Sequence, residues 1–244
     1  MGALYVVGIG PGGEGGMTAD ARAALEACDL VCGYTEYIKL VAPLVDGTET
    51  LATPMMREIE RCRAALAAAE EGRTVAMVCS GDAGVYGMAS PILELANEYP
   101  SVEVKVVAGV SAAQSGAAVL GAPLSHDFAT ISLSDLLTPW ELIERRLDAA
   151  GAADFCICLY NPRSKKRAGH LARAAEILLR HRAPETPCGW VRSIGRPDET
   201  SGTLTLGELG AFEADMFTTV FIGNSQTKMI AGRMVTPRGY RSER

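Results

Sequence analysis

Residues 3–13 read Ala-Leu-Tyr-Val-Val-Gly-Ile-Gly-Pro-Gly-Gly, an apolar run that passes directly into a glycine-rich turn. An apolar run of this length predicts a buried strand, and the glycines predict the loop that follows it. Thr18 is the expected N-cap of an alanine-rich helix that extends to about Cys28. This order of strand, glycine-rich loop and helix is typical of the first unit of a parallel α/β sheet.

The same alternation of strands and helices continues along the chain. Further strands are predicted at 30–33, 74–79, 102–107, 128–133, 154–160, 187–193 and 217–222, and helices at 56–71, 85–99, 139–149 and 167–182. A stretch of small residues at 109–124 should contain a helix that links two halves. The fold class is therefore α/β, with a mostly parallel sheet in an N-terminal domain (1–112) and a mixed sheet in a C-terminal domain (113–238). We expect residues 239–244 to form a mobile tail.

The composition favours a cytoplasmic protein that binds neither nucleic acid nor a membrane. The 244 residues carry a formal net charge of −6, whereas binding to a phosphate backbone normally needs a basic face. One local basic cluster is either a solvated loop or a binding patch, and it consists of Arg163, Lys165, Lys166 and Arg167. The N-terminus has no recognisable secretion signal, and no apolar stretch approaches the ~18 residues that span a bilayer.

The seven cysteines are interpreted as reduced thiols and not as a disulfide framework, because their number is odd and no CxxC motif occurs. Cys28 and Cys32 could share a helix face, and Cys156 and Cys158 a strand face, which leaves a metal or redox site as the alternative. No pair has the spacing of a structural zinc site. We therefore expect small buried side chains and no bound metal.

Three of the predicted strands end in loops rich in glycine or small residues, at Gly8–Gly13, Ser80–Gly84 and Gly109–Ala112. In an open α/β sheet, ligands bind at the carboxyl ends of the strands. Glycine lets a ligand approach the backbone closely, so that backbone amides can bind it. Three such loops together indicate a nucleotide-like ligand.

A dinucleotide is the first alternative for this ligand, because glycines at 8, 10 and 13 satisfy GxGxxG. The helix, however, is expected to begin only at about Thr18, whereas the dinucleotide fingerprint needs a helix N-terminus directly at the pyrophosphate. Asp29 precedes the second strand, which puts its carboxylate at the wrong edge of the sheet, and no GK[ST] sequence provides a Walker lysine. Adenosine joined to an amino acid fits this pattern better.

The glycine-rich loops also carry a resemblance to a known family. The segments Val7–Gly12, Ser80–Gly87 and Gly109–Ala113 resemble the tetrapyrrole (corrin and porphyrin) methylases in order and spacing, over nearly the whole chain. These motifs alone would also suit diphthine synthases and ribosomal-RNA ribose methylases. A second set of motifs resembles the precorrin-3B C17-methyltransferase branch, and it comprises Pro123–Phe128, Ile131–Asp135, Leu159–Pro162 and Gly223–Thr227.

The resemblance implies a two-domain tetrapyrrole-methylase-like fold, a homodimer, and S-adenosylmethionine (SAM) bound in the cleft between the domains. It implies C-methylation of precorrin-3B to precorrin-4 with ring contraction in cobalamin biosynthesis, which leaves S-adenosylhomocysteine as product. The alternative is cobalt-factor III of the anaerobic route. Some relatives carry a cysteine-rich extension with an iron–sulfur centre, and its absence here favours the metal-free substrate. Three competing functions stay open: a same-fold SAM enzyme acting on RNA or protein, a nucleotide-binding module without activity, and a nicotinamide-dependent dehydrogenase.

The resemblance further implies a set of cofactor contacts, at Pro11, Gly81, Asp82, Val85, Ser111, Ala112, Leu159, Tyr160 and Gly195. For Asp82 the alternative is that its carboxylate only accepts hydrogen bonds from neighbouring amides of its own tight loop.

The catalytic group has several candidates. In the uroporphyrinogen-methylating relatives an aspartate that has been treated as a base commonly follows the second strand. Tyr34 stands at the matching position here in place of an aspartate, and it is the catalytic candidate that the resemblance gives at this position. His126 and Asp135, with Asp127 and Ser132 near them, are candidates for moving protons during ring contraction. A loop histidine that only bonds Asp127 is the alternative. The tetrapyrrole carboxylates need cationic partners, for which the candidates are Arg57, Arg163 and Lys165.

Overall fold

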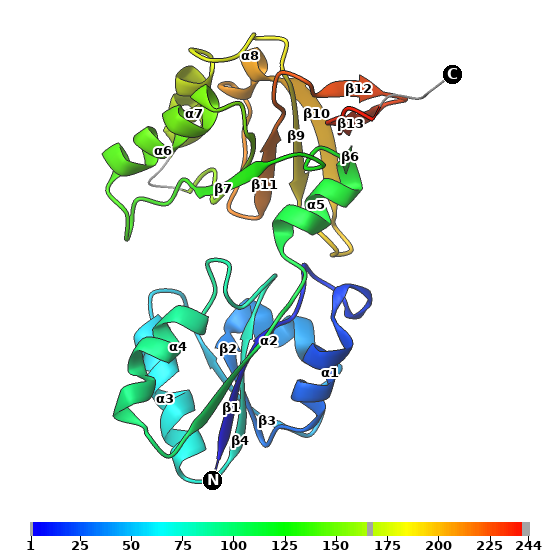
Figure 1. Ribbon diagram of the computed structural model, residues 1–244. Coiled ribbons are helices and arrows are strands. Elements are labelled where there is room, and N and C mark those ends of the chain that lie inside the picture. The colour runs from blue at the N-terminus through cyan, green and yellow to red at the C-terminus, as the bar shows by residue number, and fades with distance from the viewer. Residues whose placement is uncertain (1, 165–167, 241–244) are drawn as a thin grey trace. The chain divides into compact units, whose positions relative to one another are not determined.

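The computed structural model describes residues 2–164 and 168–240, and it divides into two compact units, the first ending at Ala112 and the second beginning at Ala113 (Figure 1). The first unit has a five-stranded parallel sheet with the order β3-β2-β4-β1-β5. Its strands are β1 (Ala3–Gly8), β2 (Leu30–Tyr34), β3 (Glu49–Thr53), β4 (Thr74–Cys79) and β5 (Glu103–Val107). Its helices are α1 (Ala19–Glu26), α2 (Thr35–Val41), α3 (Glu58–Glu70) and α4 (Ala89–Leu95), with short 3₁₀ turns η1 (Glu14–Gly16) and η2 (Ala96–Glu98).

Helices cover both faces of this sheet, because successive strand residues point to opposite faces and are apolar on both. One core contains Val6 and Met77 together with residues of α3 and α4. The other contains Val7 and Val78 together with residues of α1 and α2. Figure 1 shows α3 and α4 on one side of the sheet and α1 on the other.

Local signals set several boundaries as expected. The Thr18 hydroxyl accepts a hydrogen bond from the Ala21 amide at 3.2 Å and caps α1. Gly72 follows α3 with φ of +95°, a conformation that suits glycine.

The helix predicted at 85–99 was wrong in its first turn, since α4 begins only at Ala89. Tyr86 has φ of +55°, outside the helical region, and the Ala89 amide donates to the Ala83 carbonyl at 3.0 Å. The loop after β4 is therefore longer and more tightly wound than its composition indicates.

The second unit has a mixed five-stranded sheet with the order β10-β9-β11-β8-β7, in which only β7 and β8 pair in parallel. Its strands are β7 (Phe128–Ser132), β8 (Cys156–Tyr160), β9 (Pro187–Arg192), β10 (Thr200–Thr205) and β11 (Thr218–Ile222). A smaller sheet consists of β6 (Gly121–Ala122), β12 (Lys228–Ile230) and β13 (Arg233–Val235). The helices are α5 (Ala112–Leu120), α6 (Trp140–Ala152), α7 (His170–Leu178) and α8 (Leu206–Leu209). The parallel and mixed sheets confirm the predicted fold class.

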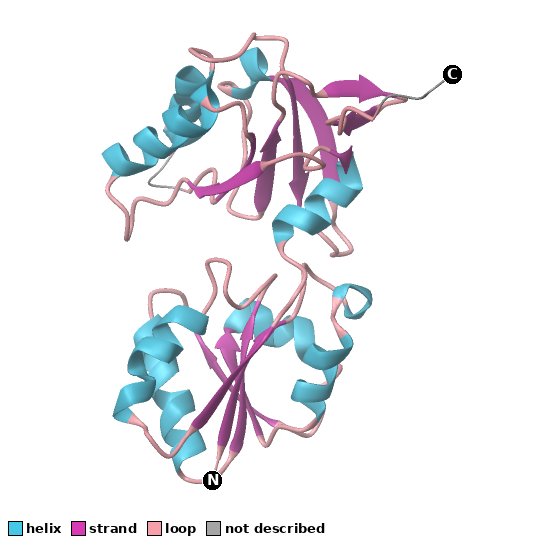
Figure 2. Cartoon of the chain, in the orientation of Figure 1, coloured by secondary structure: helices cyan, strands magenta, loops and turns pink. Residues whose placement is uncertain are grey.

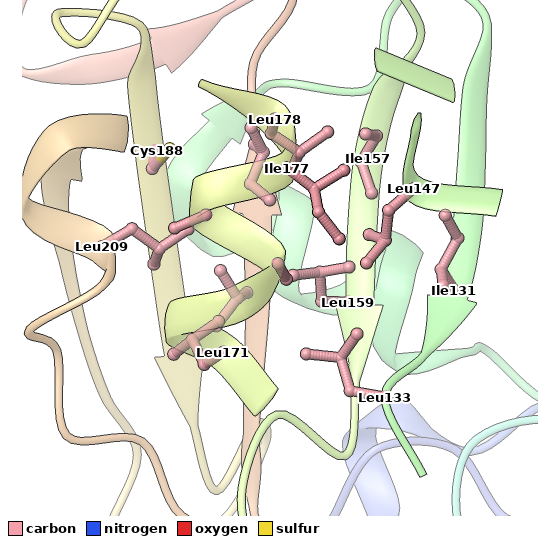
Figure 3. Close-up of a cluster of buried hydrophobic side chains, with 14 of the residues drawn as sticks. Ile131, Leu133, Leu147, Ile157, Leu159, Leu171, Ile177, Leu178, Cys188 and Leu209 are labelled. Atoms are coloured by element: carbon pink, nitrogen blue, oxygen red, sulfur yellow. The ribbon is translucent and has the colours of Figure 1, made fainter. Parts of the chain in front are cut away.

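The core of the second unit lies under α6, α7 and α8, where side chains of β7 and β8 meet those of α7 (Figure 3). Ile157, Leu159 and Ile177 are essentially inaccessible there. Helix α5 covers the opposite face (Figure 2), where a β-carbon at Gly116 would come within 2.7 Å of the Phe221 ring. Close packing of α5 on this sheet therefore depends on that glycine.

Two sequence predictions fall partly outside the described residues. The helix predicted at 167–182 is observed as α7, and residue 167 is not described. The tail predicted at 239–244 is described only as far as Tyr240. Within the described ranges, none of the helices has the length and apolar character needed to cross a bilayer.

Candidate functional site

In the first unit, the loops after β1 and β4 are joined through their backbones. The Gly10 amide donates to the Gly81 carbonyl at 3.0 Å, and the Gly81 amide donates to the Gly10 carbonyl at 2.7 Å. The Ile9 amide extends the contact by donating to the Cys79 carbonyl at 2.9 Å. The two strand ends therefore continue as one paired ribbon beyond the edge of the sheet.

The loop after β5 touches this ribbon through Gly109. A β-carbon there would lie 2.2 Å from the Gly81 carbonyl oxygen and 2.5 Å from the Gly8 carbonyl oxygen, distances that real β-carbons do not reach. Gly81 itself has φ of +71°, in the left-handed region. The three glycine loops predicted from sequence thus lie together, with their backbones in direct contact at the carboxyl edge of the sheet.

Asp82 ties two of these loops together. Its Oδ1 accepts a hydrogen bond from the Gly84 amide at 2.8 Å, and its Oδ2 accepts one from the Gly109 amide at 3.0 Å. The Asp82 carboxylate therefore accepts hydrogen bonds from backbone amides, as the alternative to a cofactor contact had it. A carboxylate has about four lone-pair sites, so these two bonds leave capacity for a ligand donor.

The other residues predicted for the first unit also lie on or beside these loops. Pro11 and Val85 are half-buried, and Ser111 is buried just before Ala112, the first residue of α5. Tyr34 lies at the carboxyl end of β2, the same edge of the sheet, with its ring edge-on to that of Tyr37 at 5.2 Å between centroids.

In the second unit, three strands end at one edge of the sheet. Ser132 of β7 is opposite Tyr160 of β8, and β9, which runs in the same direction, ends there at Arg192. The Tyr160 hydroxyl accepts a hydrogen bond from the Ala113 amide at 2.9 Å, which joins this edge to the first turn of α5. We call the edge at which β7, β8 and β9 end the carboxyl edge of the second sheet.

Two further predicted cofactor contacts have distinct settings. The Leu159 side chain is buried in the core, so only its backbone is available to a ligand. Gly195 lies in the exposed loop after β9, has φ of +70°, and donates its amide to Glu199 Oε2 at 2.7 Å.

The structure does not bring His126 together with Tyr160 and Asp135. His126 precedes β7, whereas Asp135 follows it, and a strand of five residues spans about 16 Å. Its Nδ1 accepts a hydrogen bond from the Asp127 amide at 2.9 Å, and its side chain is half exposed. The loop-bonding alternative therefore describes the setting of His126 and Asp127.

The histidine at the carboxyl edge is His170, which sequence reasoning missed. Its Nδ1 is 2.9 Å from the Leu133 carbonyl oxygen, so Nδ1 carries a proton, and its Nε2 is 3.8 Å from Asp135 Oδ2. The ring stacks on that of Trp140 at 4.1 Å. Its sequence signal is its place after Gly169 near the start of a predicted helix, because the contacts that fix it come from the loop after β7 and from Trp140 of α6.

The cationic candidates are largely paired with the chain's own acids. Arg57 Nη1 lies 2.6 Å from Glu60, and Arg163 Nη1 lies 3.5 Å from the exposed Glu213. Lys165 is outside the described residues. Among the residues that are described, no group of three or more His, Cys, Asp or Glu side chains lies where it could hold a metal ion.

Comparison with known proteins gives the class to which this fold and site belong. The family model of the tetrapyrrole (corrin/porphyrin) methylases matches residues 3–210, so the chain belongs to that family of methyltransferases. It is 49% identical to a probable cobalt-factor III C(17)-methyltransferase of Salmonella typhimurium, over 97% of this chain and 99% of that protein. It is 41% identical to a precorrin-3B C(17)-methyltransferase of a Sinorhizobium species, over 98% of this chain and 97% of that protein.

Among solved structures, the methyltransferase CobJ matches with a TM-score of 0.92 at 37% identity, covering 97% of this chain and 100% of that one. Several other curated relatives are longer proteins, of which this chain spans about half. The resemblance found in the sequence motifs is thereby confirmed.

Proposed function

We propose that this protein transfers the methyl group of SAM to C17 of a tetrapyrrole in cobalamin biosynthesis, with contraction of the macrocycle. The observation that carries the proposal is the 49% identity, along almost the full length of both chains, to the Salmonella protein named for cobalt-factor III. The first glycine loop supports it, because α1 begins only at Ala19, whereas a pyrophosphate site needs a helix N-terminus directly after the glycines.

The residues present fit SAM at one edge of the first sheet. The lack of a side chain at Gly109 lets the three loops meet at this edge, and Asp82 keeps acceptor capacity beside them. The cofactor contacts proposed in the second unit are Leu159 through its backbone, Tyr160 and Gly195. SAM supplies an electrophilic methyl group on a sulfonium, so the protein's task is alignment of the acceptor carbon and exclusion of water.

The tetrapyrrole is proposed to be cobalt-factor III or precorrin-3B. Chain length does not favour the metal-free substrate, since the Salmonella relative named for the cobalt substrate is covered to 99% by this chain. Identity to that relative is 49%, against 41% for the Sinorhizobium relative named for precorrin-3B. The cobalt-containing substrate is therefore favoured, and the sequence expectation based on a missing extension is set aside.

The test is incubation of the purified protein, without oxygen, with methyl-labelled SAM and each tetrapyrrole in turn. Label on a product with the absorbance change of a contracted ring supports the proposal, and the sample that gains it identifies the substrate. Binding of SAM without label in either tetrapyrrole would leave the family intact and overturn the substrate. RNA and a protein extract serve as control acceptors.

We propose further that the protein is a homodimer and that SAM contacts residues of both domains, as the family resemblance implies. From the sequence itself we propose that the protein is cytoplasmic and that the boundary between its domains follows Ala112. Light scattering tests the dimer, for which a mass of about twice the 25.7 kDa of one chain is expected. A mass equal to one chain at micromolar concentration would contradict it.

A further inference from the structure

The loop that follows β9 holds one arginine in an unusual setting. Ser193 has φ of +53° and Gly195 has φ of +70°, so two of its residues are in the left-handed region, which is uncommon for serine. The Arg196 amide donates to the Ser193 carbonyl at 2.9 Å, and the Glu199 amide donates to the Arg196 carbonyl at 3.0 Å. The backbone of this loop is therefore fixed by its own hydrogen bonds, with Arg196 at its centre.

The two acids beside Arg196 are turned to other donors. Asp198 Oδ2 accepts from the Ser193 hydroxyl at 2.9 Å, and Glu199 Oε2 accepts from the Gly195 amide at 2.7 Å. The Arg196 guanidinium lies over the Phe217 ring at 5.3 Å from its centroid. Within residues 2–164 and 168–240, no carboxylate forms an ion pair with it, and its buried Nε has no hydrogen-bond partner.

Neighbouring arginines at the carboxyl edge of the second sheet differ from Arg196 in having a carboxylate within ion-pair distance. The buried Nε of Arg192 resembles that of Arg196, since among the described residues neither has a hydrogen-bond partner. Arg192 lies 3.1 Å from Asp215 Oδ2, and Arg163 lies 3.5 Å from Glu213 Oε1. A guanidinium that is partly desolvated against an aromatic ring gains more from a carboxylate than one in bulk water. Its planar fork can bind both oxygens of a carboxylate at once.

We infer that Arg196 binds a carboxylate of one of the two substrates, an inference that rests on the proposed function. The ligand chemistry has two sources: an acidic side chain of the tetrapyrrole, or the methionine carboxylate of SAM. Contact with the Phe217 ring restricts the position of the guanidinium before the ligand arrives, which reduces the ordering cost of binding.

The test compares Arg196→Gln and Arg196→Lys with the matched control Arg145→Gln. Arg145 is exposed on α6 and, like Arg196, forms no ion pair within the described part of the chain. Its substitution by Gln removes one positive charge, as Arg196→Gln does, without affecting the loop after β9. Calorimetric titration gives the SAM dissociation constant, absorbance titration gives tetrapyrrole affinity, and label transfer gives KM and kcat. Thermal unfolding of each variant checks that it is folded.

Loss of a charge-assisted carboxylate contact should weaken one ligand at least about tenfold in Arg196→Gln, with a smaller loss in Arg196→Lys and none in Arg145→Gln. A raised tetrapyrrole KM with an unchanged SAM dissociation constant identifies the tetrapyrrole as the source. A raised SAM dissociation constant identifies SAM.

Folded Arg196→Gln that binds both ligands within about twofold of the wild-type protein would overturn the inference, whether or not the wild-type protein is active. Wild-type protein that transfers no label to either tetrapyrrole overturns the proposed function instead. The two binding titrations still decide the role of Arg196 in that case.

Discussion

The carbonyl oxygens of Gly8 and Gly81 occupy the space into which a side chain at Gly109 would extend. An alanine β-carbon would lie 2.2 and 2.5 Å from the Gly81 and Gly8 oxygens, and both are backbone atoms that cannot rotate away. Gly15, in the neighbouring 3₁₀ turn η1, has nothing within 4 Å of such a β-carbon. Two glycines of the same unit thus differ sharply in their need to lack a side chain.

We therefore expect Gly109→Ala to push the loops after β1, β4 and β5 apart, at a cost of about 1–3 kcal/mol in the free energy of unfolding. SAM binding should fall at least about tenfold, because the same backbone forms the proposed site. Urea denaturation and SAM titration measure the two effects. The control Gly15→Ala should stay within about 0.5 kcal/mol of wild type, and equal behaviour of the two variants would contradict the close contact.

Asp82 offers a second residue-scale test, because each of its carboxylate oxygens accepts one backbone amide. In Asp82→Asn one of these oxygens becomes an NH₂ group, which cannot accept from an amide. The free energy of unfolding should drop by about 1–3 kcal/mol, and SAM affinity should fall with it.

The control for this change is Asp46→Asn, at an exposed position whose side chain forms no hydrogen bond or ion pair with the described residues. Urea denaturation of both variants measures the change in the free energy of unfolding that each substitution causes. Unchanged stability of Asp82→Asn would mean that Asp82 does not hold the two loops together.

At the scale of helices and strands, the predictable strands are those that carry runs of apolar residues. Strands β1 and β4 were predicted because they read as continuous apolar runs, and both lie inside the first sheet. Strands β3 and β10 were missed, since each is at the edge of its sheet and consists mostly of polar or exposed residues. The apolar composition of a strand therefore decides whether it can be predicted, as at the edge strand β5, which was predicted from its valines although none of its residues is buried.

The same reasoning applies to the candidate site. Its glycine loops could be predicted because a strand followed directly by glycines is a local pattern. His170 and Arg196 could not, since the partners that define them, Trp140 and Phe217, are 30 and 21 residues away in the chain. Chemistry that depends on a distant neighbour has no local signature.

Buried cysteines give the strands a pH-dependent stability. Burial raises the pKa of the Cys32, Cys79 and Cys188 thiols from 9.0 to about 12, and these lie on β2, β4 and β9. Between about pH 9 and 12 the unfolded chain therefore loses protons that the native protein keeps. Unfolded protein binds fewer protons in this window, so native stability falls as the pH rises through it.

We expect the free energy of unfolding to fall between pH 8 and 10, with each such thiol contributing about 1 kcal/mol of the loss. Urea denaturation at several pH values measures it. Cys188→Ala is the comparison, because it removes one of these thiols. The free energy of unfolding of this variant should fall less steeply with pH than that of the wild-type protein, whatever the stability of the variant at pH 7. An identical slope in both proteins would contradict a raised thiol pKa at this position.

At the scale of the whole chain, two units with separate hydrophobic cores are predicted to respond to one ligand. SAM at about a hundred times its dissociation constant should stabilise the state that binds it by about 2.7 kcal/mol. For a chain of this length, that corresponds to a rise of roughly 5–10 °C in the midpoint of thermal unfolding. Removal of SAM by dialysis should reverse the rise.

The variants Gly109→Ala and Gly195→Ala separate the contributions of the two units to this rise. Gly195 has φ of +70°, which an alanine adopts only with strain, whereas Gly169 has no positive φ and would have nothing within 4 Å of an added β-carbon. If SAM contacts residues of both units, Gly109→Ala and Gly195→Ala should each remove most of the rise in the unfolding midpoint. The control Gly169→Ala should keep the full rise. A full rise in folded Gly195→Ala, with its loss in Gly109→Ala, would contradict a SAM contact at the Gly195 loop, because a ligand shifts an equilibrium only through its differential affinity for the two states.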